Sequence, residues 1–262
     1  MNLQEAILTF NSCSSPASKE HAISKVDSRA LLIVTLLYLV LLLAVPIFLP
    51  GKIIWFAIYP IVMSPLCGFS YSSVFKKSLY VLPFVMLIGV FNPIFDNRPA
   101  FVAGDIEVSF GWLSFLSLTL RGLMAVQALL ILLRASGFLS LCHGFHRMGF
   151  PSVLITQLLM LYRFIGILME ESLTLKRAVA ARGYGKSSFP IRLWARILGA
   201  LMLRTLDRAS RVYNAMSARN FSGHFHVSIR EEWNGRSSLF AASWTIIFFF
   251  LYFFDLSSLF MR

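Results

Sequence analysis

The chain has few charged residues and several long apolar runs. Asp, Glu, Lys and Arg make up only 14% of its 262 residues, whereas 57% are hydrophobic and the mean hydropathy is +0.72. Soluble domains carry about 25% charged residues, because their surfaces need them. The composition therefore argues against a soluble domain and predicts a membrane protein.

Cysteines and enzyme motifs are also scarce. Cys13, Cys67 and Cys142 are far apart in the sequence, which argues against a disulfide framework or a zinc ribbon. The Walker A, Gly-x-Ser-x-Gly and His-Glu-x-x-His motifs are all absent. Asp96 and Asp255, the acidic residues beside apolar runs, are too few for a proton relay. We expect a non-catalytic chain that binds no cofactor and does not itself hydrolyse ATP.

Acidic residues are half as numerous as basic ones, 12 against 24, and the excess is concentrated in one block. Residues 134–236 contain fifteen Lys or Arg and five Asp or Glu, which gives a net charge of +10. Proteins that bind single-stranded nucleic acid place exposed aromatic residues among their basic ones. Here the arginines alternate mostly with Leu, Ile and Met. We expect this block to face anionic lipid headgroups or an acidic protein partner, and no nucleic acid.

Five apolar runs have about the 20-residue length that crosses a bilayer. They cover residues 30–49, 53–69, 79–95, 113–133 and 238–254. The positive-inside rule places the N-terminal arm, the Lys76-Lys77 turn and the basic block in the cytoplasm. The acidic loop that contains Asp96, Asp105 and Glu107 then falls outside.

The basic block reads as two long helices. Pro151 opens one that runs to Arg182, and Pro190 opens another that runs to about Asn220. Each would be about 45 Å long. We predict an all-α polytopic membrane protein with about five transmembrane helices and two long cytoplasmic coupling helices. The domains are then a cytoplasmic arm at 1–29, four transmembrane helices within 30–133, a coupling domain at 134–236 and a last transmembrane helix within 237–262.

Both long helices end in a similar motif, Ala181-Arg182-Gly183 and Ala218-Arg219-Asn220. A single arginine at a helix C-terminus is explained by the helix dipole. Two such ends in similar surroundings favour a second interpretation. In it, each guanidinium donates paired hydrogen bonds to a carboxylate or carbonyl in a groove of a partner. The small alanine would let each helix end approach that partner closely.

Three further features stand out. Arg121 lies near the centre of an apolar run and should face protein or water, either as a structural pair with a carbonyl or acidic group or as a moving contact. Arg163 lies in the first long helix and can extend to lipid headgroups. Asn92-Pro93 would end the third run near the outer face.

At these residues the chain resembles the transmembrane T component of energy-coupling factor (ECF) transporters, and specifically the cobalt-type Q subunit, CbiQ. The resemblance covers nearly the whole chain. It rests on Ser24-Lys25-Val26-Asp27-Ser28-Arg29, Phe91-Asn92-Pro93, Arg121, Leu161-Tyr162-Arg163 and, most specifically, Arg211-Val212-Tyr213-Asn214-Ala215-Met216. One departure is Asn220, where the family usually has glycine, although asparagine is the next best residue at a left-handed helix end.

The resemblance implies a coupling subunit in the cytoplasmic membrane, with two ATP-binding-cassette ATPases and a substrate-binding membrane S component as partners. Arg182 and Arg219 would each dock in a groove on one ATPase, and the substrate would be cobalt for cobalamin biosynthesis. A T component for nickel or a vitamin is the alternative within this class. From other classes, an intramembrane lipid-modifying enzyme would need a polar cluster at headgroup level, and a scaffold unconnected to ATPases leaves the paired motifs unexplained.

Several Cys and His residues have the chemistry of metal ligands. Cys142-His143 and His146 have the spacing of metal ligands, and His224 and His226 add two imidazoles. All would lie on the cytoplasmic side, and the resemblance places the metal site in the partner subunit. We therefore expect no metal site in this chain.

Overall fold

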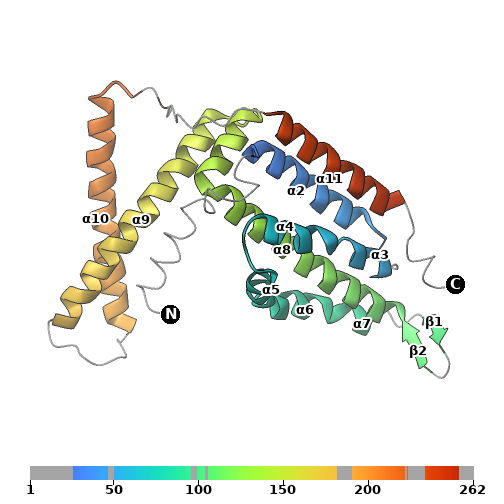
Figure 1. The fold of residues 1–262 in the computed structure, drawn as a ribbon. Coiled ribbons are helices and arrows are strands. Elements are labelled where there is room, and N and C mark those ends of the chain that lie inside the picture. The colour runs from blue at the N-terminus through green and yellow to red at the C-terminus, as the bar shows by residue number, and fades with distance from the viewer. Residues whose placement is uncertain are drawn as a thin grey trace. The chain divides into compact units, whose positions relative to one another are not determined.

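The computed structural model describes residues 26–46, 50–95, 99–103, 106–181, 191–221, 223 and 234–253 (Figure 1). Apart from one two-stranded hairpin, the elements in these ranges are all helices, so the prediction of an all-α polytopic membrane protein is confirmed. The described residues form two compact units. The larger unit contains residues up to 144 and from 234 onward, and the smaller unit contains residues 145–223.

Within its described residues, the larger unit contains eight helices and the hairpin. They are α2 Ser28–Ala44, α3 Pro50–Trp55, α4 Ile58–Leu66, α5 Tyr71–Leu79, α6 Leu82–Gly89, α7 Phe91–Phe95, β1 Pro99–Ala103, β2 Ile106–Ser109, α8 Phe110–Arg147 and α11 Gly235–Phe253. The strands β1 and β2 pair antiparallel between α7 and α8. The helix α8 is interrupted at Gly137, whose φ of 72° is accessible to glycine at little cost.

The buried apolar residues of the larger unit come mainly from α2, α4, α8 and α11, and α2 runs along α11 (Figure 1). Asp27 caps the start of α2 through its side chain, and its backbone N–H donates to Ser237 Oγ at the start of α11, at 3.0 Å. Further along, the Tyr38 and Tyr59 rings stack with centroids 4.5 Å apart, and Trp244 meets Tyr59 edge-on at 5.0 Å. These contacts join the first and last described helices of the chain into one core.

The helices that are able to span a membrane differ in part from the five spans predicted from the sequence. Within the described residues, α8, α9 and α11 are long and apolar enough to cross a membrane, and the bent pair Tyr71–Leu79 with Leu82–Ile94 would make a fourth span. The first two predicted spans form shorter helices, Ser28–Ala44 and Gly51–Leu66. Pro46 explains the early end of α2, because the residue before a proline favours extended backbone and Val45 has φ −60° and ψ 135°.

The smaller unit contains the two long helices α9, Ser152–Ala181, and α10, Ile191–Ser217. They begin one residue after Pro151 and Pro190, as the proline start signals predict. The helix α9 is also long and apolar enough to span a membrane, although the sequence analysis assigned it to the cytoplasmic block. Its apolar residues are concentrated in its first half, whereas Glu170 and Glu171 begin a charged second half.

Candidate functional site

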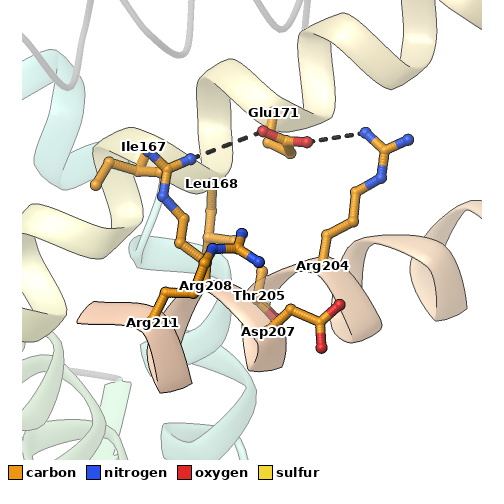
Figure 2. Close-up of a pocket in the computed structure, with 8 residues that line it drawn as sticks. All are labelled: Ile167, Leu168, Glu171, Arg204, Thr205, Asp207, Arg208 and Arg211. Atoms are coloured by element: carbon orange, nitrogen blue, oxygen red, sulfur yellow. Dashed lines mark hydrogen bonds and ion pairs between the residues drawn. The ribbon is translucent and has the colours of Figure 1, made fainter. Parts of the chain in front are cut away.

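The helices α9 and α10 cross in the smaller unit, and the crossing is held by Glu171 (Figure 1). Glu171 Oε1 lies 2.9 Å from Arg204 Nη1, and its Oε2 lies 3.9 Å from Arg208 Nη1 (Figure 2). Arg204 and Arg208 can share one carboxylate because residues four apart lie on the same face of a helix. One side chain of α9 therefore binds two successive turns of α10.

A cavity of about 290 Å³ opens at this crossing (Figure 2). It is lined by Ile167, Leu168, Glu171, Arg204, Thr205, Asp207, Arg208 and Arg211. The side chains of Arg204 and Glu171 are 55% and 29% exposed. Ion pairs this accessible to water contribute about 0.2–1 kcal/mol each. They therefore set the position of the two helices more than they stabilise the fold.

The helix α10 buries none of its residues, and α9 buries only Ile155. Apolar side chains of α10 remain exposed beside its arginines, among them Leu198, Met202, Leu206 and Tyr213. An amphipathic helix with both its apolar and its basic side chains open to solvent is typical of a surface that contacts a partner or a membrane. Among the described residues, this pair of helices is thus well suited to an external contact.

The Ala218-Arg219-Asn220 motif forms the capped end of α10. Asn220 has a φ of 57°, the left-handed conformation found at helix C-termini. The Phe221 N–H donates to Met216 O at 3.1 Å, and the Asn220 N–H donates to Ser217 O at 3.1 Å. These two bonds define a Schellman motif, in which Arg219 is the last residue before the turn. The motif leaves Arg219 exposed at the tip of the helix.

The chain beyond this cap returns to the start of α9. Gly223 has a φ of 87°, and its carbonyl accepts a hydrogen bond from Thr156 Oγ1 at 3.2 Å. The end of α10 is therefore tied to the first turns of α9. The other motif follows α9 directly, since Ala181 is its last residue, whereas Arg182 and Gly183 lie outside the described residues.

Arg121 lies in the larger unit, where its side chain reaches the end of α2. It is 9% exposed, and its guanidinium donates to the carbonyls of Val45 and, at 3.4 Å, of Leu43. The last carbonyls of a helix have no partner within the helix, and water cannot serve them inside a bilayer. Arg121 thus satisfies backbone groups that the early end of α2 leaves open.

The remaining candidate residues are not brought together with these sites. Arg163 is exposed on α9, and Asn92 and Pro93 lie inside α7, after α6 has already ended at Gly89. In the described part of the chain no three His, Cys, Asp or Glu residues are grouped as metal ligands. Cys142 is buried in α8, and His224 and His226 lie outside the described residues.

Sequence reasoning missed the role of Glu171. The signal was present, because α9 carries adjacent carboxylates in its middle while α10 carries arginines at spacings of three and four. Which carboxylate meets which arginine depends on the crossing point of the two helices, and that is a tertiary property. A separation of 33 residues between Glu171 and Arg204 gives no local pattern to detect.

Apolar helices of spanning length, together with a pair of exposed amphipathic helices, define a polytopic membrane protein. Residues 19–229 match the family CbiQ, described as cobalt transport protein. The chain therefore belongs to this family of transport proteins.

Two relatives show the extent of the likeness. The chain is 38% identical over 88 residues to the cobalt transport protein CbiQ of Rhodobacter capsulatus, a match that covers 33% of this chain and 36% of that protein. It is 28% identical over 159 residues to the cobalt transport protein CbiQ of Salmonella typhimurium, covering 56% of this chain and 70% of that protein. The first match thus spans about a third of the relative's length, and the second more than two thirds.

Proposed function

We propose that this chain is the transmembrane coupling subunit of an ATP-driven importer of the energy-coupling factor type. It transmits the motion of two ATP-binding-cassette ATPases to a separate substrate-binding membrane subunit, and the substrate is cobalt. It lies in the cytoplasmic membrane, with α9 and α10 accessible to the ATPases. Membership of the CbiQ family supports the transport role and the substrate.

The observation that carries the coupling role is the end of α10. A Schellman turn at Asn220 and Phe221 ends the helix, and the exposed Arg219 lies in this turn, two residues after the last residue of α10, Ser217. A guanidinium presents up to five N–H donors in a rigid plane, which suits carboxylates and carbonyls at the bottom of a groove. Arg182, which follows the last residue of α9, is proposed to dock in the same way on the second ATPase.

The crossing of α9 and α10 explains how such docking can transmit force. Each helix is stiff, because every turn is fixed by backbone hydrogen bonds. A displacement applied at Arg219 therefore moves the whole of α10, and the contact at Glu171 passes that displacement to α9. When the two ATPases approach each other on binding ATP, the two helices change their relative position, and the substrate-binding subunit that rests on them is tilted.

The proposal is tested by removing both arginines, in the double variant Arg182→Ala and Arg219→Ala. The tagged chain is purified from membranes that contain its transporter partners, and co-purified ATPase, ATP turnover and uptake of radioactive cobalt are measured. We expect loss of all three. The matched control is Arg192→Ala, because Arg192 is an exposed arginine near the other end of α10. Unchanged values for the double variant would contradict the proposal, and uptake of nickel in place of cobalt would correct its substrate.

A further inference from the structure

The cavity at the crossing of α9 and α10 is lined by more cations than anions. Its lining contains three arginines and two carboxylates, which leaves one positive charge. Glu171 already binds Arg204 at 2.9 Å and Arg208 at 3.9 Å (Figure 2). Among the described residues, neither Arg211 nor Asp207 forms an ion pair. One further anion of single charge would therefore neutralise the lining.

Arg208 and Arg211 keep hydrogen-bond donors for such an anion. The distance of 3.9 Å between Arg208 Nη1 and Glu171 Oε2 is longer than a hydrogen bond, so this ion pair leaves the guanidinium donors of Arg208 available. Arg211 follows Arg208 by three residues and lies on the same side of α10. Two guanidinium groups at such neighbouring positions suit a phosphate, whose oxygens accept paired N–H bonds.

The cavity lies where α9 changes from apolar to charged. Residues 152–169 contain a single charged residue, and the charged half of the helix begins at Glu170. Ile167 and Leu168 line the cavity from the last apolar turn, and Glu171 lines it from the first charged turn. Only 6% of an 18-residue apolar stretch of α9 is buried in the described part of the chain. An uncovered apolar stretch of this length is stable in the hydrocarbon of a bilayer, and this places the cavity at the level of the lipid headgroups.

An exposed apolar row leads from the cavity along the apolar half of α9. Leu161 and Leu154 precede Leu168 by seven and fourteen residues, which places all three on one face of the helix. Leu161 is 55% exposed and Leu154 is 49% exposed. An apolar chain attached to an anion in the cavity can lie along this row, whereas a free phosphate gains nothing from it. The surroundings of the cavity thus favour the phosphate of a lipid.

We propose that this cavity binds one anionic phospholipid. Its phosphate contacts Arg208 and Arg211, and its acyl chains lie beside Leu154 and Leu161. Glu171 holds the arginines in place, and the lipid supplies the negative charge that the lining lacks. A zwitterionic lipid suits the cavity less, because its ammonium group adds a positive charge to a lining that already has an excess. The inference goes beyond the coupling function and needs no ATPase.

The test uses the purified full chain in a neutral detergent. The chain is titrated with phosphatidylglycerol, phosphatidylcholine or phosphatidylethanolamine of the same acyl chains, and bound lipids are counted by native mass spectrometry. We expect the first phosphatidylglycerol to bind at least about 5-fold more tightly than the first molecule of either zwitterionic lipid, the factor that one basic residue contributes near an anionic surface. Equal affinities would overturn the proposal, and they are the result expected if an acidic segment of a protein partner occupies the cavity.

Inorganic phosphate distinguishes a lipid from a free anion. The chain loaded with phosphatidylglycerol is mixed with a large excess of phosphate, and a parallel sample receives sodium chloride to the same ionic strength. We expect the lipid to stay bound, because its acyl chains add contacts along α9 that phosphate cannot replace. Displacement by phosphate but not by chloride would overturn the assignment to a lipid.

Arg211→Gln removes one proposed donor and leaves the ion pairs of Glu171 intact. We expect phosphatidylglycerol to bind about 5-fold more weakly, with unchanged binding of phosphatidylcholine. The matched control is Arg196→Gln, which makes the same change of charge at an exposed arginine of α10 that does not line the cavity. Equal losses in the two variants would overturn the proposal, because general attraction to a basic surface would then explain the binding.

Asp207→Asn should have the opposite effect. It removes a carboxylate from the lining, whose net charge rises from one to two positive charges. We expect phosphatidylglycerol to bind more tightly by up to about 5-fold, the factor that one charge at about 4 Å contributes in water, and a damaged fold would not produce this result. The control is Glu170→Gln, at an exposed carboxylate of α9 that does not line the cavity. Weaker or unchanged binding in the Asp207 variant would overturn the proposal.

Discussion

Asn220 turns the chain into the left-handed conformation directly after Arg219, and this places the arginine at the exposed tip of α10. The Phe221 N–H closes the turn on Met216 O, at 3.1 Å. The position needs a residue that tolerates a positive φ, and Asn and Gly are the two that do so most readily. The geometry of the tip is thus set by the residue that follows the arginine.

Replacing Asn220 tests this relationship. Asn220→Gly should keep the turn, because glycine adopts a positive φ without steric cost. Asn220→Val should disfavour it by about 1–2 kcal/mol, since Cβ approaches the carbonyl oxygen in this conformation. Amide hydrogen exchange at Phe221 measures the difference. We expect exchange about 5–30-fold faster in the valine variant and nearly unchanged exchange in the glycine variant.

Equal exchange in the two variants would show that the left-handed turn does not hold the end of α10. ATPase co-purification adds a functional readout. The glycine variant should bind the ATPases as the unmodified chain does, and the valine variant more weakly, because Arg219 then has no fixed position.

Arg121 should be important for the stability of the larger unit. Arg121→Leu leaves the carbonyls of Leu43 and Val45 without the donor that they have in the structure. An unsatisfied buried polar group costs about 1–3 kcal/mol. Thermal unfolding in detergent should show this loss, whereas Arg121→Lys, which retains a cation and three donors, should lose less. A leucine variant as stable as the unmodified chain would contradict this role.

The close packing of α6 on α8 gives a further prediction. A Cβ on Gly122 would lie 2.9 Å from Val85 Cγ1 and 3.1 Å from its Cγ2. Gly122→Ala should therefore destabilise the larger unit by about 1–3 kcal/mol, the usual cost of overpacking. Val85→Ala removes both of the obstructing methyl groups. The double variant should therefore lose less stability than the sum of the losses in the two single variants.

The control for this pair is Gly199→Ala in α10, where nothing lies within 4 Å of the added Cβ. That change should be neutral or slightly stabilising, because alanine favours a helix more than glycine does. Thermal unfolding of the four variants forms a double-mutant cycle with its control. Purely additive effects of Gly122→Ala and Val85→Ala would show that the two helices are not in direct contact there.

The sequence was informative wherever a local signal decides the structure. Pro151 and Pro190 marked the starts of α9 and α10, and Asn220 was recognised as suited to a left-handed helix end. The overall class followed from composition alone, because so few charged residues cannot cover a soluble surface.

Features that depend on distant residues could not be predicted. Arg121 was expected to face protein, but its partners at Leu43 and Val45 lie 78 and 76 residues away. The observed helices also differ from the predicted spans, because an apolar run has a high mean hydropathy whether or not prolines divide it. Pro46 follows the end of α2, and the next run contains Pro60 and Pro65. The sequence analysis also did not predict the hairpin of β1 and β2 before α8, because its pairing depends on two short segments that meet only in the folded chain.

The most direct test of the coupling function is a contact between the tip of α10 and an ATPase. A photo-reactive amino acid is introduced at Ala218, beside Arg219, or at Leu203, which is 67% exposed on the same helix. The full transporter is then irradiated in membranes, and the cross-linked products are identified by mass spectrometry. We predict an adduct between position 218 and an ATPase subunit, and none from position 203. The account would be contradicted if position 218 gave no ATPase adduct while the ATPases remained bound.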